Sequence, residues 1–273
     1  MQINCKGNLI DLSTPKVMGV LNLTPDSFYD GGAYKNTNQA LAQVEKMLNE
    51  GSTFIDVGAY SSRPGANHIS EEEEKKRLLP IVQELIAEFP DILISVDTFR
   101  ANIAKAAIDA GASIINDISA GNLDENMFST IAELQVPYIM MHMKGTPQTM
   151  KQLSQYKDVV EEINFYFSEK LSQARNLGIN DCIIDPGFGF AKNIAQNYEL
   201  LKHLDALQFH DVPVLVGLSR KSMIYKLLNT TPQEALNGSS ILNTIAIQKK
   251  ANILRVHDVK EAVEVIQLLA QFN

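Results

Sequence analysis

The stretch NILRVHDVKEA, residues 252–262, passes from a strand pattern to a helix pattern with no linker between them. The apolar run 253–256 is typical of a buried β-strand. Residues 258–272 repeat apolar side chains at helical spacing and predict a helix. Arg255 lies inside the apolar run and His257 follows its end, although both residues prefer water or an anion to an apolar core. The stretch therefore indicates a strand–helix unit whose strand ends on polar side chains.

The same strand-then-helix pattern recurs along the whole chain. We predict strands at residues 16–23, 54–58, 92–97, 113–118, 138–142, 182–185, 214–219 and 253–257. We predict helices at residues 39–50, 70–89, 101–111, 158–178 and 258–272, and a shorter one at 220–228. Ser70 with Glu73 has the spacing of a capping box, and Asp258 with Glu261 repeats that spacing.

Alternating strands and helices favour a parallel sheet, because parallel strands need crossover connections. Eight such units in about 250 residues match the size of a closed barrel. We therefore predict an α/β fold, a (β/α)8 TIM barrel in a single domain over residues 1–273, with an N-terminal β-hairpin at 3–12 plugging one end. The alternative is an open doubly wound sheet, but LNLTPDSF at 21–28 is not the Gly-rich loop that such a sheet places after its first strand.

The chain has 24 basic and 32 acidic side chains and a formal net charge of −8. Nucleic acid is therefore not an expected partner, since phosphate contacts need surplus Lys and Arg. A small anion can still bind a local cationic cluster. No apolar run approaches the ~20 residues that span a bilayer, and residues 1–16 lack a secretory signal pattern. With only Cys5 and Cys182 and no disulfide framework, we expect a cytoplasmic protein.

Polar side chains stand at or near the end of every predicted strand. They are Asn22, Asp56, Asp97, Asn116, His142, Asp185, Ser219, and Arg255 with His257. In a closed barrel all these ends open on one face, where the active sites of such enzymes lie. Asp56, His142 and Ser219, each taken alone, are better interpreted as cap or turn residues. The whole set predicts a shared pocket.

Seven motifs, in this order, resemble those of dihydropteroate synthases. They are MGVLNLTPDSFYDGG (18–32), SSRPGA (61–66), SVDTFR (95–100), INDIS (115–119), DPGFGFAKN (185–193), GLSRKS (217–222) and RVHDV (255–259). The resemblance implies a Mg²⁺-requiring transferase of folate biosynthesis, a sulfonamide target and a homodimer. It would join p-aminobenzoate to a dihydropterin diphosphate and release pyrophosphate. The small-molecule substrates would be its partners, with no membrane.

The resemblance assigns Asp97, Asn116, Asp185 and Lys221 to the pterin. A pterin carries donors along its amino-pyrimidinone edge, which carboxylate and amide oxygens accept. The resemblance implies a dissociative reaction, in which pyrophosphate leaves a cationic methylene conjugated with the ring. Asp97 and the other acceptors would stabilise that spreading positive charge in the transition state. Asp97, Lys221, Arg255 and His257 are thus the predicted catalytic residues.

The diphosphate needs cations and donors, because its developing negative charge must be neutralised as it leaves. Arg255 has a guanidinium fork matched to phosphate oxygens, and His257 adds a donor. Asn22 has an oxygen suited to Mg²⁺. The resemblance gives these three residues the same roles and adds Ser62 and Arg63 from the loop after the second strand.

For p-aminobenzoate, the candidates are Phe28, Pro64, Phe190 and Ser222. The first three, with the stem of Lys221, would form an apolar slot on surface loops. Ser222 and the start of its helix suit a carboxylate.

The chain departs from the family pattern at one position. Many members carry Gly-Glu-Ser-Thr-Arg-Pro-Gly, and this chain has Tyr60 in place of the Glu and Ser62 in place of the Thr. Two alternatives remain at this point. One is the pterin-binding domain of a folate-dependent methyltransferase, and the other is a protein that binds the pterin diphosphate without catalysis.

Overall fold

The computed structural model describes residues 1–23, 33–61 and 68–272. Its large sheet consists of β3 (Lys16–Asn22), β4 (Phe54–Gly58), β5 (Ile94–Asp97), β6 (Ile114–Asp117), β7 (Tyr138–Met141), β8 (Cys182–Asp185), β9 (Leu215–Val216) and β10 (Ile253–Val256). These strands are parallel and lie in the order β8-β7-β6-β5-β4-β3-β10-β9. A parallel bridge between Ile184 and Val214 joins the two edges, and the Ile184 N–H donates to Pro213 O at 2.9 Å. The predicted barrel is confirmed.

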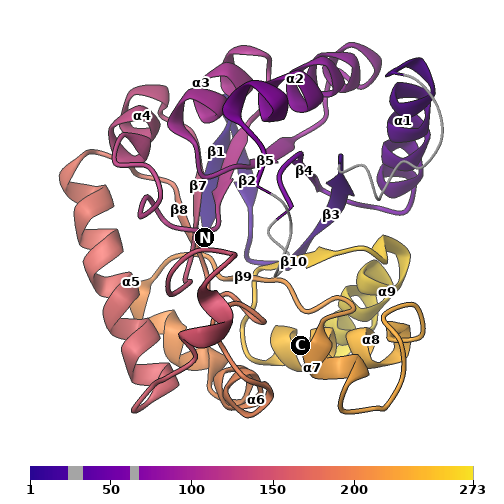
Figure 1. The fold of residues 1–273 in the computed structure, drawn as a ribbon. Coiled ribbons are helices and arrows are strands. Elements are labelled where there is room, and N and C mark those ends of the chain that lie inside the picture. Colours follow the sequence, from indigo (N-terminus) through magenta and orange to yellow (C-terminus); the bar gives the residue numbers. More distant parts are fainter. Residues whose placement is uncertain (24–32, 62–67, 273) are drawn as a thin grey trace.

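The helices form a ring outside the sheet, and their colours follow the chain order around it (Figure 1). They are α1 (Ala33–Asn49), α2 (Glu71–Glu88), α3 (Ala101–Asp109), α4 (Met127–Leu134), α5 (Val159–Asn176), α6 (Ile194–Lys202), α7 (Ser222–Tyr225), α8 (Leu236–Gln248) and α9 (Val259–Leu269). The 3₁₀ segments are η2 (Met150–Gln152), η3 (Leu204–His210) and η4 (Ala270–Phe272). In the described part of the chain, no helix has the length and apolar character needed to cross a membrane.

The N-terminal hairpin closes one end of the barrel. β1 (Gln2–Cys5) pairs antiparallel with β2 (Asn8–Asp11). Ile3, Cys5 and Leu12 are fully buried. They pack against side chains from the first residues of the barrel strands, including Phe54 and Ile253. The predicted plug is therefore present, at the end of the barrel opposite the strands' carboxyl ends.

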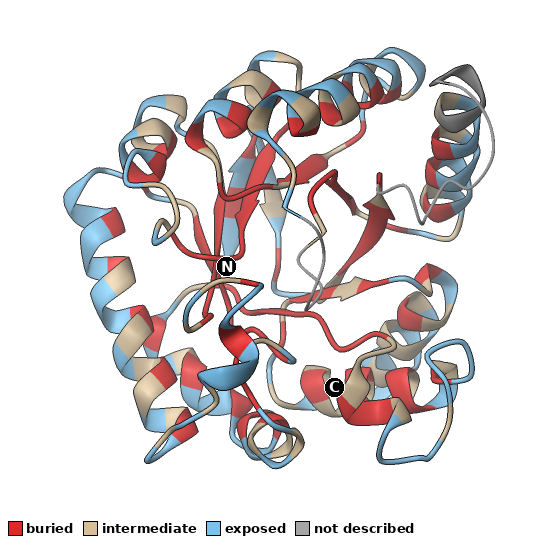
Figure 2. Ribbon diagram, in the orientation of Figure 1, coloured by how far each residue is buried: buried red, intermediate tan, exposed pale blue. Residues whose placement is uncertain are grey.

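The strands are buried on both faces, and the helices bury one stripe each (Figure 2). This explains why the strands appear in the sequence as continuous apolar runs instead of alternating patterns. The larger core cluster lies between the sheet and the helices and contains side chains such as Val57, Ile115 and Phe167. The barrel thus has a rigid wall from which the strand ends project.

The two predicted capping boxes are not complete in the structure. Ser70 Oγ accepts the Glu73 N–H at 3.2 Å, but the Glu73 carboxylate pairs with Arg77 at 2.7 Å instead of completing a capping box. Asp258 makes no cap hydrogen bond, because its carboxylate binds Arg220 through two hydrogen bonds of 2.7 and 2.9 Å. At α2 the Ser70 cap is present and an ion pair replaces only the second half of the box, whereas at α9 an ion pair takes the place of the cap.

Three helices, α4, α6 and α8, were not predicted. A complete capping box does exist at α6, between Asn193 and Gln196. α8 carries Gly238, Ser239 and Asn243, which are weak helix formers, and all three are buried in the packing. Tertiary burial therefore stabilises α8 where propensity does not.

Candidate active site

Arg255 connects three strands at the open end of the barrel. Its Nε donates to Asp56 Oδ2 at 2.6 Å, and its Nη2 donates to Asp97 Oδ2 at 3.1 Å. Asp56 lies on β4 and Asp97 ends β5, so a cation from β10 joins two neighbouring strands across the barrel interior. The sequence had placed Arg255 at the mouth, but it did not show this pair of carboxylates.

Asp56 is fully buried and is the centre of the polar network. Besides Arg255, it accepts from Ser95 Oγ at 2.6 Å and from Asn116 Nδ2 at 3.2 Å. Asp56 therefore orients Asn116, which is predicted to bind the pterin, and Arg255, which is predicted to bind the diphosphate. The cap interpretation of Asp56 was wrong, because its partners are side chains of other strands.

Asp97 lies between Asp56 and the opening. Burial raises its pKa to about 7, and the charges of Asp56 and other carboxylates act in the same direction. The Arg255 guanidinium opposes this rise in the pKa. Asp97 pairs with Asn116 in the β5–β6 register, so the two predicted pterin acceptors stand side by side.

The opposite side of the mouth carries Asp185 and Lys221. Asp185 ends β8 and accepts the Gly187 N–H at 2.7 Å. Burial raises its pKa, while the Lys221 charge and the Gly187 N–H lower it. Burial lowers the pKa of Lys221 to about 8, and Asp185 opposes that shift. Lys221 donates to Phe188 O and its Nζ lies 5.1 Å from the centre of the Phe190 ring.

The two sides belong to one site. A Cβ atom built on Gly217 would lie 3.7 Å from Lys221 Nζ and 3.9 Å from Arg255 Cβ, so both cationic residues flank the same point. The charges of Asp185 and Arg255 also act on each other's pKa. The predicted convergence of Asp97, Asn116, Asp185, Lys221 and Arg255 at one opening is therefore what the structure shows.

His257 and Ser222 lie at the rim. The backbone N–H of His257, an exposed residue, donates to Ser219 Oγ at 3.2 Å. Ser219 therefore joins the ends of the last two strand regions and does not cap a helix. The predicted helix 220–228 is shorter, and Ser222 is its first residue.

Asn22 ends β3, between β4 and β10, and is half-buried. The described residues contain no group of three or more His, Cys, Asp or Glu side chains arranged around a metal. A Mg²⁺ ion bound through one protein oxygen, with substrate phosphates and waters as its other ligands, fits such a setting. Phe28, Ser62, Arg63 and Pro64 lie outside the described residues.

Lys192 is a buried site residue that the sequence analysis did not assign. Its Nζ donates to Gly187 O and Phe190 O, each at 3.0 Å, and lies 3.1 Å from His142 Nδ1. Burial lowers the pKa of Lys192 well below its usual value and the pKa of His142 to about 2. A neutral His142 can accept from Lys192 Nζ, so the pair holds the loop that carries Phe190. The only signal in the sequence was the position of Lys192 inside the motif DPGFGFAKN.

Comparisons with known proteins agree with this site. The model of the family described as pterin binding enzyme matches residues 18–257. Dihydropteroate synthase of Escherichia coli (strain K12) is 43% identical over 271 residues, which is 98% of this chain and 95% of the relative.

Two solved structures also align over nearly their full length. Yersinia pestis dihydropteroate synthase with a sulfonamide drug complex has a TM-score of 0.93 at 43% identity, covering 100% of this chain and 99% of that one. Xanthomonas albilineans dihydropteroate synthase in complex with 7,8-dihydropteroate has a TM-score of 0.90 at 36% identity, covering 100% and 98%. Matches of this length and identity show that the chain belongs to the pterin binding enzyme family, among the dihydropteroate synthases.

Proposed function

We propose that this chain condenses 6-hydroxymethyl-7,8-dihydropterin diphosphate with p-aminobenzoate to give 7,8-dihydropteroate and pyrophosphate. The observation that carries this proposal is the single opening in which Asp97, Asn116 and Asp185 face Lys221 and Arg255. The oxygen atoms of the first three side chains can accept hydrogen bonds from the pterin ring. The two cationic side chains beside them can bind the pyrophosphate as it leaves. The relatives at 40–43% identity carry the name of this enzyme, which favours it over a methyltransferase domain or a binding protein without catalysis.

The pterin ring would bind to the acceptors on the strands. Asp185 would take the donors of the amino-pyrimidinone edge, and Asn116 and Asp97 would take donors on the other parts of the ring. Lys221 would donate to a ring carbonyl and nitrogen. Because Asp97, Asn116 and Asp185 stand on barrel strands, the sheet hydrogen bonds hold these three acceptors in place before the ligand arrives. Such preorganisation lowers the entropic cost of binding.

The diphosphate would lie beside Arg255 and His257, with Ser62, Arg63 and Asn22 as further ligands. The Arg255 side chain is 23% exposed, so part of it faces the opening while its Nε and Nη2 hold Asp56 and Asp97. Mg²⁺ held by Asn22 would supply charge neutralisation at the diphosphate oxygens. Arg255 would do the same from the protein side, as a fixed cation that needs no reorganisation during the reaction.

The reaction would be dissociative. The bond between the methylene carbon and the diphosphate oxygen breaks, and the electron pair leaves with pyrophosphate. The positive charge that remains spreads over the pterin, where the ionised Asp97 carboxylate stabilises it. The aniline nitrogen of p-aminobenzoate then forms the new carbon–nitrogen bond and releases a proton. No protein nucleophile takes part.

The p-aminobenzoate would lie between the Phe190 ring and the stem of Lys221, with Phe28 and Pro64 completing the slot. Phe190 is half-buried on a loop and is not a core residue. Its ring faces the Lys221 ammonium, so this wall of the slot is apolar with a cation above it. Ser222 and the backbone at the start of α7 would bind the carboxylate.

The chain would act as a homodimer in the cytoplasm. Leu227, Leu228 and Ile241 are each more than half exposed, and they would offer apolar contacts to a second copy of the chain. Cys5 and Cys182 are both free and buried, as in a reducing compartment. Light scattering on the purified protein would test the dimer, and a mass of 30.2 kDa would contradict it.

The function is tested by mixing the purified protein with the pterin diphosphate, p-aminobenzoate and Mg²⁺, and measuring dihydropteroate and pyrophosphate in equal amounts. Chelation by EDTA should stop turnover and added Mg²⁺ should restore it. Asn22→Ala should raise the Mg²⁺ concentration needed for half-maximal rate, with little change at saturating Mg²⁺. Absence of product above background would reject the proposed activity.

A further inference from the structure

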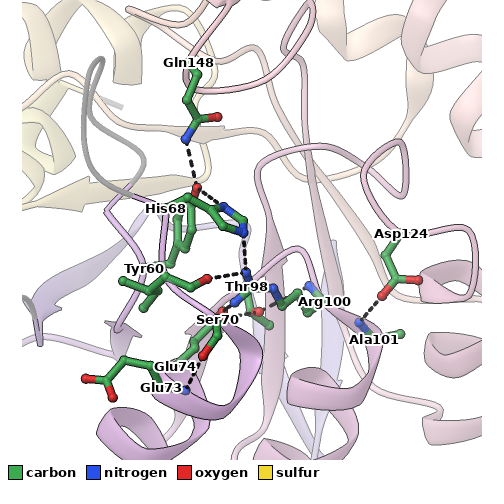
Figure 3. A network of polar contacts seen from close by, with 11 residues as sticks. Tyr60, His68, Ser70, Glu73, Glu74, Thr98, Arg100, Ala101, Asp124 and Gln148 are labelled. Atoms are coloured by element: carbon green, nitrogen blue, oxygen red, sulfur yellow. Dashed lines mark hydrogen bonds and ion pairs between the residues drawn. The ribbon is translucent and has the colours of Figure 1, made fainter.

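Tyr60 lies two residues after β4, the strand that carries Asp56, and its hydroxyl makes two contacts. His68 Nδ1 lies 3.2 Å from the hydroxyl oxygen, and Gln148 Nε2 donates to that oxygen at 3.0 Å (Figure 3). Gln148 belongs to the segment that follows β7, and His68 lies shortly before α2. A single buried hydroxyl therefore joins two segments that are distant in sequence.

The second ring nitrogen of His68 determines the direction of these hydrogen bonds. His68 Nε2 lies 3.4 Å from Arg100 Nη2, which also donates to Ile69 O at 2.7 Å (Figure 3). A guanidinium only donates, so His68 Nε2 accepts and Nδ1 carries the hydrogen. Tyr60 Oη thus accepts from both His68 and Gln148. The Arg100 contact therefore selects this tautomer of His68, since in the other tautomer the Tyr60 hydroxyl would be the donor to His68 Nδ1.

A buried carboxylate anchors the other end of the bridge. Glu74 is fully buried on α2, pairs with Arg100 and accepts from Thr98 Oγ1 at 2.7 Å. Thr98 directly follows Asp97. The Tyr60 bridge is therefore fastened to the segment that directly follows Asp97, while Asp97 itself lies in the sheet.

The Tyr60 ring extends the connection toward the aminobenzoate slot. It packs edge-on against Phe99, with ring centres 5.0 Å apart. Both rings belong to a small buried cluster with Met141, Ala191 and others, and Phe190 packs against that cluster. The ring and hydroxyl of Tyr60 thus contact or support segments that follow β4, β5, β7 and β8.

We propose that Tyr60 is a positioning residue for p-aminobenzoate: its hydroxyl holds the segments after β4 and β7 together, and this arrangement sets the affinity for the second substrate. The inference rests on the proposed function. Pterin affinity should not depend on Tyr60, since Asp97, Asn116 and Asp185 are held by strand hydrogen bonds.

The test is Tyr60→Phe, which removes only the hydroxyl. We expect the KM for p-aminobenzoate to rise about tenfold, because two hydrogen bonds are lost and 1.4 kcal/mol corresponds to about a factor of ten. The kcat and the Kd for the pterin diphosphate should change less than about twofold. Gln148→Leu should give a similar rise in KM, and the double variant should add little to either single one.

The matched control is Tyr166→Phe. The Tyr166 hydroxyl also makes two hydrogen bonds, donating to Ser119 O and accepting from Asn122 Nδ2, each at 3.2 Å. Tyr166→Phe should lower the melting temperature about as much as Tyr60→Phe and leave the KM for p-aminobenzoate unchanged. An equal rise in KM in both variants, or none in Tyr60→Phe, would overturn the proposal.

A measurement without turnover separates this proposal from the proposed function. Nitrogen-15 NMR of the histidines should show His68 protonated at Nδ1 in the wild type, and a changed tautomer population in Tyr60→Phe. If the wild-type enzyme made no product, the proposed function would fail while the bridge was still tested. A His68 tautomer population that is the same in the wild type and in Tyr60→Phe would show that the Tyr60 hydroxyl does not bind His68, and would reject the bridge itself.

Discussion

Arg255 and Asp56 lie 199 residues apart in the sequence, yet Arg255 Nε is 2.6 Å from Asp56 Oδ2. Through Asp97, the same guanidinium reaches the pterin side of the mouth. The predicted sites for the leaving anion and for the ring are therefore one hydrogen-bonded network. A substitution at any residue of this network should affect both the binding of the pterin ring and the departure of pyrophosphate.

Removing Asp56 should destabilise the protein and abolish most activity. Asp56→Ala leaves the Arg255 guanidinium without its nearest carboxylate, and breaking a buried ion pair costs about 3–5 kcal/mol. Asp56→Asn keeps the shape and should lose less stability. Urea unfolding gives the free energy of unfolding, and the product assay gives kcat/KM. Near-normal activity in Asp56→Ala would contradict the role of Asp56 in holding Arg255 and Asn116.

The pH dependence of kcat/KM should be bell-shaped, with its maximum between about 7 and 8. Asp97 must be ionised to stabilise a cation, and its pKa is raised to about 7, so the rate falls below that pH. Lys221 must be protonated to donate, and its pKa is lowered to about 8, so the rate falls above that pH. Asp97→Asn should lack the acid limb and Lys221→Arg the alkaline limb. Variants that keep both limbs would show that other groups titrate.

The same shift of Asp97 predicts the effect of pH on stability. Because the pKa of Asp97 is raised from 3.8 to about 7 on folding, the folded state binds this proton more tightly than the unfolded state. Its contribution to the free energy of unfolding therefore decreases as the pH rises through that window. Asp97→Asn should flatten the stability curve between about pH 4 and pH 7. If the free energy of unfolding fell more steeply with pH in Asp97→Asn than in the wild type, the pKa of Asp97 would not be raised by folding.

Replacing Lys192 should loosen the loop that carries Phe190. Lys192→Met keeps the volume of the side chain but leaves His142 Nδ1, Gly187 O and Phe190 O without their donor. An unsatisfied buried polar group costs about 1–3 kcal/mol, so we expect a loss of stability of at least that size and a raised KM for p-aminobenzoate. Lys151→Met, at an exposed position, is the control and should change neither quantity.

Gly187 should tolerate no side chain. Its φ is +69°, and a Cβ atom would lie 2.1 Å from the backbone oxygen of His142, which cannot move aside. Gly187→Ala should lose about 3 kcal/mol or more, by thermal or urea unfolding. Gly178 has a similar φ of +78° but no atom within 4 Å of a built Cβ, so Gly178→Ala should lose only about 1 kcal/mol. Equal losses would mean that the close approach to His142 is not decisive.

The hairpin plug should matter for stability and not for catalysis. Ile3→Ala removes a buried side chain at the end of the barrel opposite the active site and should cost about 2–5 kcal/mol. The kcat/KM of the folded fraction should stay unchanged. Leu9→Ala, on the exposed side of the hairpin, should change the stability by less than about 0.5 kcal/mol. A lowered kcat in folded Ile3→Ala would link the two ends of the barrel.

Much of the site could be predicted because polar residues at strand ends share one face in any closed parallel barrel. Asp97, Asn116, Asp185 and Arg255 were found in this way, and the resemblance to the family added Lys221. Asp56 was predicted at the right place, but with the wrong role. A strand-end carboxylate has the same local pattern whether it caps a helix or binds a cation, and only its spatial neighbours distinguish the two.

The sequence by itself determined the repeated strand–helix units, and with them the barrel, its plug at residues 3–12 and the open end where chemistry occurs. These features depend on local periodicity, which each segment carries within its own residues. Only the tertiary structure decided that Arg255 binds Asp56 and Asp97, that Lys192 binds beside His142, and that Asp258 binds Arg220 instead of capping α9. Those partners are separated by 38 to 199 residues and meet because the closed barrel brings their strand ends within hydrogen-bond distance.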